Sequence, residues 1–341
     1  MQDLLPRLLN HLDWHISRIK CLNEIIFGLI RCKSPHYSDI ADYISGDAKS
    51  ESKIKRIYRI IKKQIFDATQ FAKLLSEFCS SGKWVLTLDR TNWQCGKLQI
   101  NILALCVNIG SVSIPILINL LPKDGTSNAQ EKLEILQKFV EIFGIKKIEA
   151  LLADREFWDE QFTNYLYQSK IPFVIRLKAN LSLKHHNGGY MRCDKLMSNQ
   201  KHVKTSWRGI NFEVSAKKER DLYVASFMVT NALDLYKKRW SIETSFKALK
   251  SQGFYLERTQ IDDIVSIRKL VLMMSLAMSI AIVAGLIAEK NNMIRVIKAN
   301  GSKMYTLFKI GLKSITSWLA HRPRSLMHVF SRLQEVLCCH S

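Results

Sequence analysis

The sequence predicts an α/β protein with a mixed β-sheet at its centre, and three features of the 341-residue chain carry this prediction. Apolar side chains recur at helical spacing through the first 80 residues, which show no strand pattern. Three strand-like runs, an amphipathic helix and a fourth strand-like run then follow over residues 81–169. A β-rich stretch at 170–230 precedes a helical remainder, so helical regions flank a sheet-forming middle.

Residues 1–80 are predicted to form a helical N-terminal domain. Leu8, Leu12 and Ile16 recur every four residues, which is the spacing of one buried helix face. A further helix at 50–66 mixes isoleucines with six cations, which are Lys53, Lys55, Arg56, Arg59, Lys62 and Lys63. Such a face is either simply solvated or placed against DNA, and the sequence leaves both interpretations open.

Three predicted strands open the central segment. Residues 83–89 are apolar and end in Asp89, and two longer apolar runs at 99–109 and 111–121 are joined at Gly110. A glycine between two such runs is typical of a β-hairpin. We therefore expect the three strands to be antiparallel.

A helix and a fourth strand complete this segment. Residues 129–143 are amphipathic, follow helix-capping residues in the loop at 122–127, and stop at Gly144. Residues 148–154 form an apolar strand that ends in Asp154. Three antiparallel strands, a helix and a parallel strand, in this order, are typical of a ribonuclease-H-like sheet.

The remaining chain is strongly basic. Residues 170–230 have strand composition, and residues 164–220 carry 12 Lys and Arg against 3 Asp and Glu. A helix within 231–258 is expected to complete the core, and a basic helical region fills 259–341. Positive charge spread over several segments is expected of a protein that contacts a long polyanion.

Net charge and cysteine usage limit the class of protein. Lys and Arg total 51 against 30 Asp and Glu, a net charge of +21, which indicates nucleic acid or an acidic membrane surface as partner. The alternative is a basic surface kept only for solubility. The eight cysteines include no C-x-x-C pair, which is typical of reduced thiols in a cytoplasmic protein.

One apolar segment has the length of a membrane span. Residues 270–288 contain no charged side chain, but they include Ser275, Ser279 and Gly285. A helix that is apolar on all sides is also typical of the core of a large protein. We favour a buried core helix and expect no membrane partner.

Two lone carboxylates are the first candidate catalytic residues. Asp89 and Asp154 each end an apolar strand, where a single Asp more often caps a turn. Neighbouring strand ends would bring the two carboxylates close together, which is costly unless a cation lies between them. Carboxylate oxygens suit Mg²⁺, and paired ions support in-line displacement at a phosphodiester.

A third carboxylate lies on the helix predicted at 233–250. Tyr236, Arg239, Glu243 and Lys250 would share a stripe about 60° wide on an α-helix. The simpler interpretation is an ion pair between Arg239 and Glu243 on a solvated face. Two cations and a phenol beside a metal ligand would also form a clamp for phosphate.

These motifs resemble a known family. The spacing Tyr-x2-Arg-x3-Glu-x6-Lys, together with LTLDRTNW around Asp89 and ADREF around Asp154, is similar to bacterial insertion-sequence transposases of the IS-four group. That group belongs to the DDE transposases, which are relatives of retroviral integrases. The resemblance extends from residue 83 to residue 259 and weakly into both helical ends.

The resemblance implies roles for individual residues. Asp89, Asp154 and Glu243 would be catalytic and would bind two Mg²⁺ or Mn²⁺ ions. The DNA-binding residues would be Tyr236, Arg239, Lys250, Arg155 and Trp207. Trp207 is alternatively a core residue, and Arg155 alternatively pairs with Glu156 or Asp159.

The resemblance also implies a reaction. The protein would bind the terminal inverted repeats of a transposon, cleave double-stranded DNA and transfer the ends into target DNA, acting as a homodimer at the bacterial nucleoid. Two other functions remain open. One is a nuclease or resolvase of the ribonuclease-H fold, and the other is a catalytically silent DNA-binding inhibitor of transposition.

Overall fold

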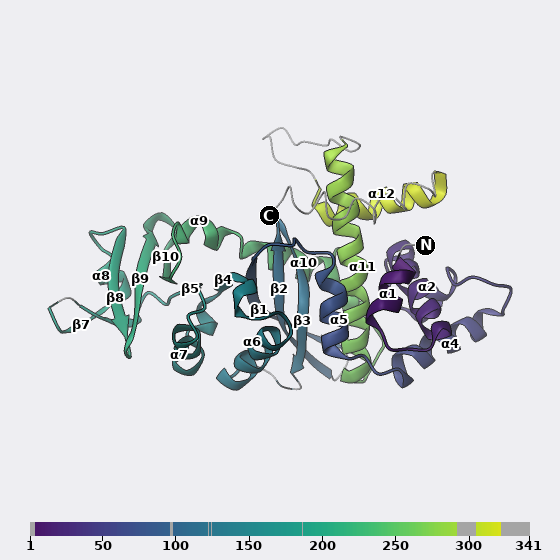
Figure 1. The fold of residues 1–341 in the computed structure, drawn as a ribbon, viewed down its shortest axis with the longest axis horizontal. Helices are drawn as coiled ribbons and strands as arrows, with labels where there is room; N and C mark the ends of the chain where they lie inside the picture. Colours follow the sequence, from purple (N-terminus) through teal and green to yellow (C-terminus); the bar gives the residue numbers. More distant parts are fainter. Residues whose placement is uncertain are drawn as a thin grey trace.

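An eight-stranded mixed β-sheet runs from the middle of Figure 1 to its left end. This computed structural model describes residues 4–95, 98–121, 123, 125–185, 187–291 and 305–321. The strand order is β3-β2-β1-β4-β5-β10-β9-β8. The strands are β1 (Trp84–Cys95), β2 (Leu98–Ile109), β3 (Val112–Leu121), β4 (Ile148–Ala153), β5 (Phe173–Arg176), β8 (His202–Trp207), β9 (Ile210–Lys217) and β10 (Leu222–Phe227).

The pairing confirms the predicted order of the central strands. β1, β2 and β3 are antiparallel, and β4 and β5 run parallel to β1. The basic stretch at 170–230 is β-rich as predicted, and β10, β9 and β8 extend the same sheet beyond β5. A separate hairpin, β6 (Ser182–Lys184) with β7 (Tyr190–Arg192), leads into the short α8 (Cys193–Leu196).

The prediction that the first strand ends at Asp89 is wrong. β1 continues through Asp89 to Cys95 because its outer half pairs with β2, up to Cys95 opposite Leu98. The parallel pairing of β1 with β4 does stop at Leu88, which lies opposite Ala153. Asp89 and Asp154 therefore still follow the last parallel pair, at the edge where β4 ends.

Five helices precede the sheet. They are α1 (Leu4–His11), α2 (Ile16–Cys32), α3 (Tyr37–Ala41), α4 (Ser50–Lys63) and α5 (Ala68–Ser76). Their apolar faces join the sheet in one continuous core, with α5 against β3 and α2 against α11. The chain enters α5 through Asp67, whose carboxylate accepts a hydrogen bond from the Gln70 backbone N–H.

Two helices flank β4. α6 (Ala129–Phe143) begins with a capping box, in which Asn128 and Glu131 each accept the other's backbone N–H. It ends at Gly144, which has φ 80°, as the sequence predicts. α7 (Glu160–Gln168) follows β4, and short 3-10 helices lie at Ile145–Lys147, Arg155–Phe157, Lys218–Arg220 and Leu256–Arg258.

The single helix predicted over 233–250 is two helices. α9 (Ala232–Lys237) and α10 (Trp240–Lys250) are separated by a turn at Lys238 and Arg239. Backbone hydrogen bonds there span three residues, including Arg239 N–H to the Tyr236 carbonyl and Ile242 N–H to the Arg239 carbonyl. The predicted stripe of Tyr236, Arg239, Glu243 and Lys250 required one continuous α-helix. This tight turn changes the angular positions of residues before it relative to those after it.

The predicted core helix is confirmed. α11 (Ile264–Lys290) passes between the sheet and the helices α1, α2 and α4 in Figure 1, and its most apolar window is 100% buried although it is long enough to cross a membrane. α12 (Leu307–His321) packs closely on it, since a Cβ at Gly311 would lie 1.6 Å from the Ala281 carbonyl oxygen. The rest of the predicted C-terminal region, 292–304 and 322–341, lies outside the described residues.

Candidate active site

The three predicted carboxylates gather at the edge of the sheet where β4 ends. Asp89 lies on β1, Asp154 directly follows β4, and Glu243 lies in the first turn of α10. α10 contacts β1, β2 and β3, which places its carboxylate over the strands. The structure therefore brings the sequence-predicted triad into one region.

Arg239 joins two of the three carboxylates. Its Nη1 donates to Asp89 Oδ2 at 2.9 Å, and its Nη2 donates to Glu243 Oε1 at 2.6 Å. The side chain of Arg239 is only 11% exposed, and that of Asp89 is 14% exposed. The predicted pair between Arg239 and Glu243 is present, but it is part of a bridge across the site instead of a solvated pair.

Tyr236 and Arg176 reach the third carboxylate. The Tyr236 hydroxyl donates to Asp154 Oδ1 at 3.4 Å, and Arg176 Nη1 lies 3.9 Å from the same oxygen. The Arg239 guanidinium lies 5.8 Å from the centre of the Tyr236 ring. Tyr236 and Arg239 therefore link all three carboxylates into one network.

Lys250 attaches the end of α10 to β1. Its Nζ donates to Thr91 Oγ1 at 3.3 Å and to the Asn92 carbonyl at 3.0 Å, and it lies 3.5 Å from Glu257 Oε1. It also lies 5.5 Å from the centre of the Trp93 ring. Lys250 is thus near the outer half of β1, past Asp89, and does not pair with the triad in the described structure.

Burial controls the protonation of the site. Desolvation raises the pKa of Asp89 to about 6, although Arg239 and the Arg90 backbone N–H lower it in part. Desolvation also raises the pKa of Tyr236 well above its usual range, so this phenol stays protonated as a donor. Desolvation lowers the pKa of Arg239, but the carboxylates of Asp89, Glu243 and Asp154 outweigh it and the net pKa is raised.

Two further charged residues, Arg90 and Arg176, were not identified from the sequence. Arg90 donates to Asn101 and pairs with Glu156 at 3.2 Å, and Arg176 approaches Asp154 from β5. The sequence does contain one indication of Arg90, because an arginine directly follows both Asp89 and Asp154. The partner of each arginine depends on strand order, which sequence spacing does not encode.

Arg155 and Trp207 lie in different surroundings. Arg155 is exposed and forms no ion pair with the described residues, because Glu156 pairs with Arg90 and Asp159 pairs with Lys132. Trp207 is half-buried, and its ring centre lies 5.4 Å from that of Trp158. The core alternative for Trp207 is thus supported by packing.

Another tryptophan is more accessible than Trp207. Trp240 opens α10 directly after Arg239 and is 62% exposed. Lys247 Nζ lies 6.0 Å from the centre of its ring. Sequence spacing does not identify Trp240, because its exposure depends on how α10 packs.

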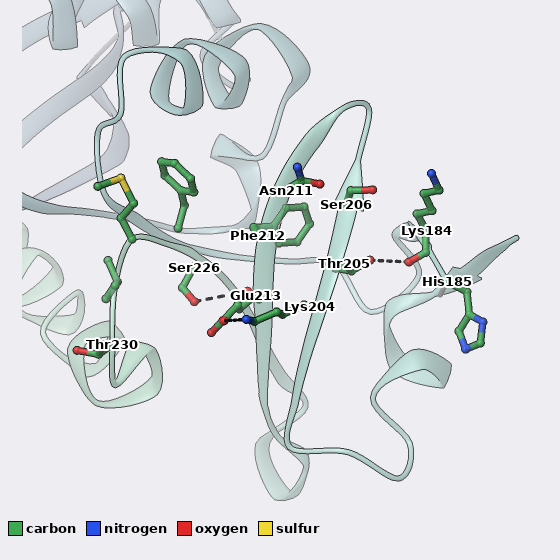
Figure 2. Close-up of a pocket in the computed structure, with 13 residues that line it drawn as sticks. Lys184, His185, Lys204, Thr205, Ser206, Asn211, Phe212, Glu213, Ser226 and Thr230 are labelled. Atoms are coloured by element: carbon green, nitrogen blue, oxygen red, sulfur yellow. Dashed lines mark hydrogen bonds and ion pairs between the residues drawn. The ribbon is translucent and has the colours of Figure 1, made fainter. Parts of the chain in front are cut away.

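A wide groove lies away from the carboxylates, on the open face of β8, β9 and β10 (Figure 2). Its volume is about 740 Å³. The lining is polar and basic along the sheet, with Lys184, His185, Lys204, Ser206, Asn211, Glu213 and Ser226, and it is apolar at Phe227 and Met228. The lining of this groove includes no member of the predicted triad.

The donors at this edge fit a hard divalent cation in kind. Asp89, Asp154 and Glu243 offer carboxylate oxygens only, which suit Mg²⁺ or Mn²⁺. Within the described residues, however, no group of three or more His, Cys, Asp or Glu is arranged to hold a metal ion. Arg239 accounts for this spacing, because its guanidinium separates Asp89 from Glu243.

Comparison with known proteins defines the class. Residues 80–280 match the family model described as the transposase DDE domain, and all three carboxylates fall within this range. The chain therefore belongs to the DDE transposase family, whose members generally use divalent metal ions. It is a DNA transposase, an enzyme that cleaves DNA and transfers strands.

Two further comparisons complete this result. A cryo-EM structure of the piggyBac transposase synaptic complex with hairpin DNA is similar over 94% of this chain and 77% of that chain, at 11% sequence identity and a TM-score of 0.48. No curated protein matches the chain.

Proposed function

We propose that Asp89, Asp154 and Glu243 are the catalytic triad of a ribonuclease-H-like core that performs cut-and-paste transposition. The observation that carries this proposal is the network at the β4 edge, where Tyr236 and Arg239 connect all three carboxylates. The strand order β3-β2-β1-β4-β5, in which β2 runs antiparallel to the other four strands, supports the ribonuclease-H-like assignment. The motif around Glu243 supports a place in the IS-four group.

The triad would hold two Mg²⁺ or Mn²⁺ ions, which would activate water and stabilise negative charge on the attacking and leaving oxygens during in-line displacement. The protein's own side chains position the DNA. Arg239 has two terminal nitrogens that suit a phosphate, and Tyr236 keeps its proton as a hydrogen-bond donor. Lys250 and the exposed Arg155 add point charges on either side of the triad.

The exposed face of α4 is a candidate surface for the transposon ends. Arg56 pairs with Glu24 at 3.1 Å and Lys62 pairs with Asp263, which ties one part of the helix to its neighbours. Lys55, Arg59 and Lys63 are exposed and form no ion pair with described residues. Unpaired cations on one helix face are available for DNA phosphates.

The division of labour follows the sequence segments. We assign inverted-repeat binding to residues 1–80 and to the basic region 259–341, catalysis to 81–169 and 231–258, and additional DNA contacts to the insertion at 170–230. Trp207 in the insertion remains a candidate to stack on a base. A homodimer in the synaptic complex and a location at the bacterial nucleoid complete the proposal.

The decisive experiment is strand transfer with a labelled duplex that ends in the inverted repeat flanking the gene. The proposal expects joined products in Mg²⁺ buffer, and a matched duplex with a scrambled end should give none. Cleavage of branched DNA without joining would indicate a nuclease or resolvase. Binding of the end without any metal-dependent cleavage would indicate a silent inhibitor.

A further inference from the structure

The bridge made by Arg239 fills the space between two proposed metal ligands. One terminal nitrogen of its guanidinium is bonded to Asp89 at 2.9 Å, and the other is bonded to Glu243 at 2.6 Å. A shared Mg²⁺ would need oxygens from both carboxylates at about 2.0–2.1 Å. The guanidinium lies between Asp89 Oδ2 and Glu243 Oε1, so a metal ion that binds these two oxygens together must displace it.

We propose that Arg239 is a built-in placeholder for the divalent cation, and that a metal ion must displace its guanidinium to bind Asp89 and Glu243 together. This inference rests on the proposed function, in which both residues are metal ligands. It adds a role for Arg239 before DNA and metal arrive, next to its proposed role in gripping phosphate.

Burial explains why a placeholder is needed. Asp89 and Arg239 are 14% and 11% exposed, so an uncompensated carboxylate there would carry a large desolvation cost. The carboxylates of Asp154 and Glu156 also lie close enough to Asp89 to disfavour its ionised form. A cation is therefore required at this point even when no metal is bound.

The other cationic side chains near the triad form hydrogen bonds or ion pairs with other residues. Lys250 is held by Thr91, Asn92 and Glu257, and Arg90 is held by Asn101 and Glu156. Arg176 Nη1 lies 3.9 Å from Asp154 Oδ1, the oxygen that also accepts from Tyr236. Among the described residues near the triad, Arg239 is the cation whose bonds span Asp89 and Glu243.

The same geometry couples metal binding to DNA binding. An arginine grips a phosphate with the nitrogens that Arg239 now donates to the carboxylates. A phosphate that takes the guanidinium would free both carboxylates for metal, so each ligand would promote the other by the same factor.

The test is a Mn²⁺ titration of the full protein without DNA, followed by electron paramagnetic resonance of the free ion. Arg239→Gln is expected to bind Mn²⁺ about 5- to 150-fold more tightly than wild type, the usual range for a coupling between two sites. Lys247→Gln is the matched control, because Lys247 is an exposed cation on the same helix without an ion pair to the described carboxylates. Its affinity should stay within about twofold of wild type, as expected for a solvent-screened charge.

Other variants separate the possible failures. Asp89→Asn should lose Mn²⁺ binding, and binding that survives in this variant would overturn the proposed triad itself. Unchanged or weaker binding by Arg239→Gln, with binding lost in Asp89→Asn, would overturn only the placeholder. An equal gain in Lys247→Gln would also overturn it, because the effect would then be general electrostatics.

A second measurement covers the case in which Arg239→Gln folds poorly. Arg239→Lys keeps the charge but cannot donate from two terminal nitrogens, so Mn²⁺ should displace it more easily than the wild-type guanidinium. Its melting temperature should rise more on addition of Mn²⁺ than that of wild type. An equal or smaller rise would contradict the placeholder.

Discussion

Charged side chains are buried and ion-paired at the β4 edge, whereas on the outer face of α4 they are exposed. At the edge, Asp89, Arg239 and Glu243 are largely buried and bonded to one another. On α4, Lys55 and Arg59 are exposed and form no ion pair within the described structure. Buried charges need partners to avoid the cost of desolvation, whereas exposed charges stay solvated until a polyanion replaces their counterions.

This difference predicts that the two regions fail differently when mutated. Changes at the edge should affect catalysis and metal binding while DNA is still bound. Changes on α4 should affect DNA affinity and its salt dependence while the chemistry of bound DNA is kept.

The largest effect is expected from the triad. Asp89→Ala, Asp154→Ala and Glu243→Ala should each reduce cleavage of a labelled transposon end by at least about 10³-fold, as for other catalytic groups that act as a unit. End binding, measured by gel shift, should be unchanged or slightly tighter because an anion near DNA is removed. Full activity of one variant in Mg²⁺ buffer would remove that residue from the triad.

The α4 face should show a large effect of the other kind. For wild type, the slope of log K against log salt is expected to be steeper than about −5, since each phosphate contact contributes about −0.9. Changing Lys55, Arg59 and Lys63 to Ala together should make the slope shallower by up to about 0.9 for each residue. Lys138→Ala is the control, since Lys138 already pairs with Glu141 at 2.9 Å.

An unchanged slope in the α4 variant would show that this face is only solvated. The α4 face would then not be assigned to DNA binding. A slope near −1 for wild type would mean that the net charge of +21 serves another purpose.

The pH dependence of the edge should be moderate. Burial raises the pKa of Asp89 to about 6, so protons compete with metal as the pH falls through this value. Mn²⁺ affinity of the DNA-free protein should be flat above about pH 6 and fall up to tenfold for each unit below it. An affinity that stays constant down to pH 5 would contradict this assignment of the pKa.

The same shift has the opposite sign for stability. The pKa of Asp89 is raised above its ordinary value of 3.8, so the folded state binds a proton more readily than the unfolded chain. Ionised Asp89 therefore costs stability above about pH 6, and the cost disappears as the pH falls towards 3.8. Asp89→Asn should raise the melting temperature near pH 7.5 and lose this advantage near pH 4.

The smallest effect is expected at Arg155. Because this exposed side chain has no ion pair among the described residues, Arg155→Ala should leave the melting temperature unchanged. It should make the salt slope shallower by about 0.9 if the side chain contacts one phosphate. A lower melting temperature with the same slope would assign Arg155 to folding instead of DNA.

Local sequence patterns determined much of the fold. The order of three strands, a helix and a strand was predictable because each run has its own period and its own turn or cap, as at Gly110 and Gly144. The continuous apolar run of α11 predicted a buried helix. The two strand carboxylates and the motif around Glu243 were also readable, because they depend on residue type and spacing along the chain.

The tertiary structure decided how these residues meet. Pairing with β2 carries β1 past Asp89, and the turn before α10 places Arg239 between Asp89 and Glu243. Arg176 reaches Asp154 only because β5 lies next to β4 in the sheet. Sequence spacing gives the phase of a residue within one element, whereas the partner of a buried charge depends on which elements pack together across long stretches of chain.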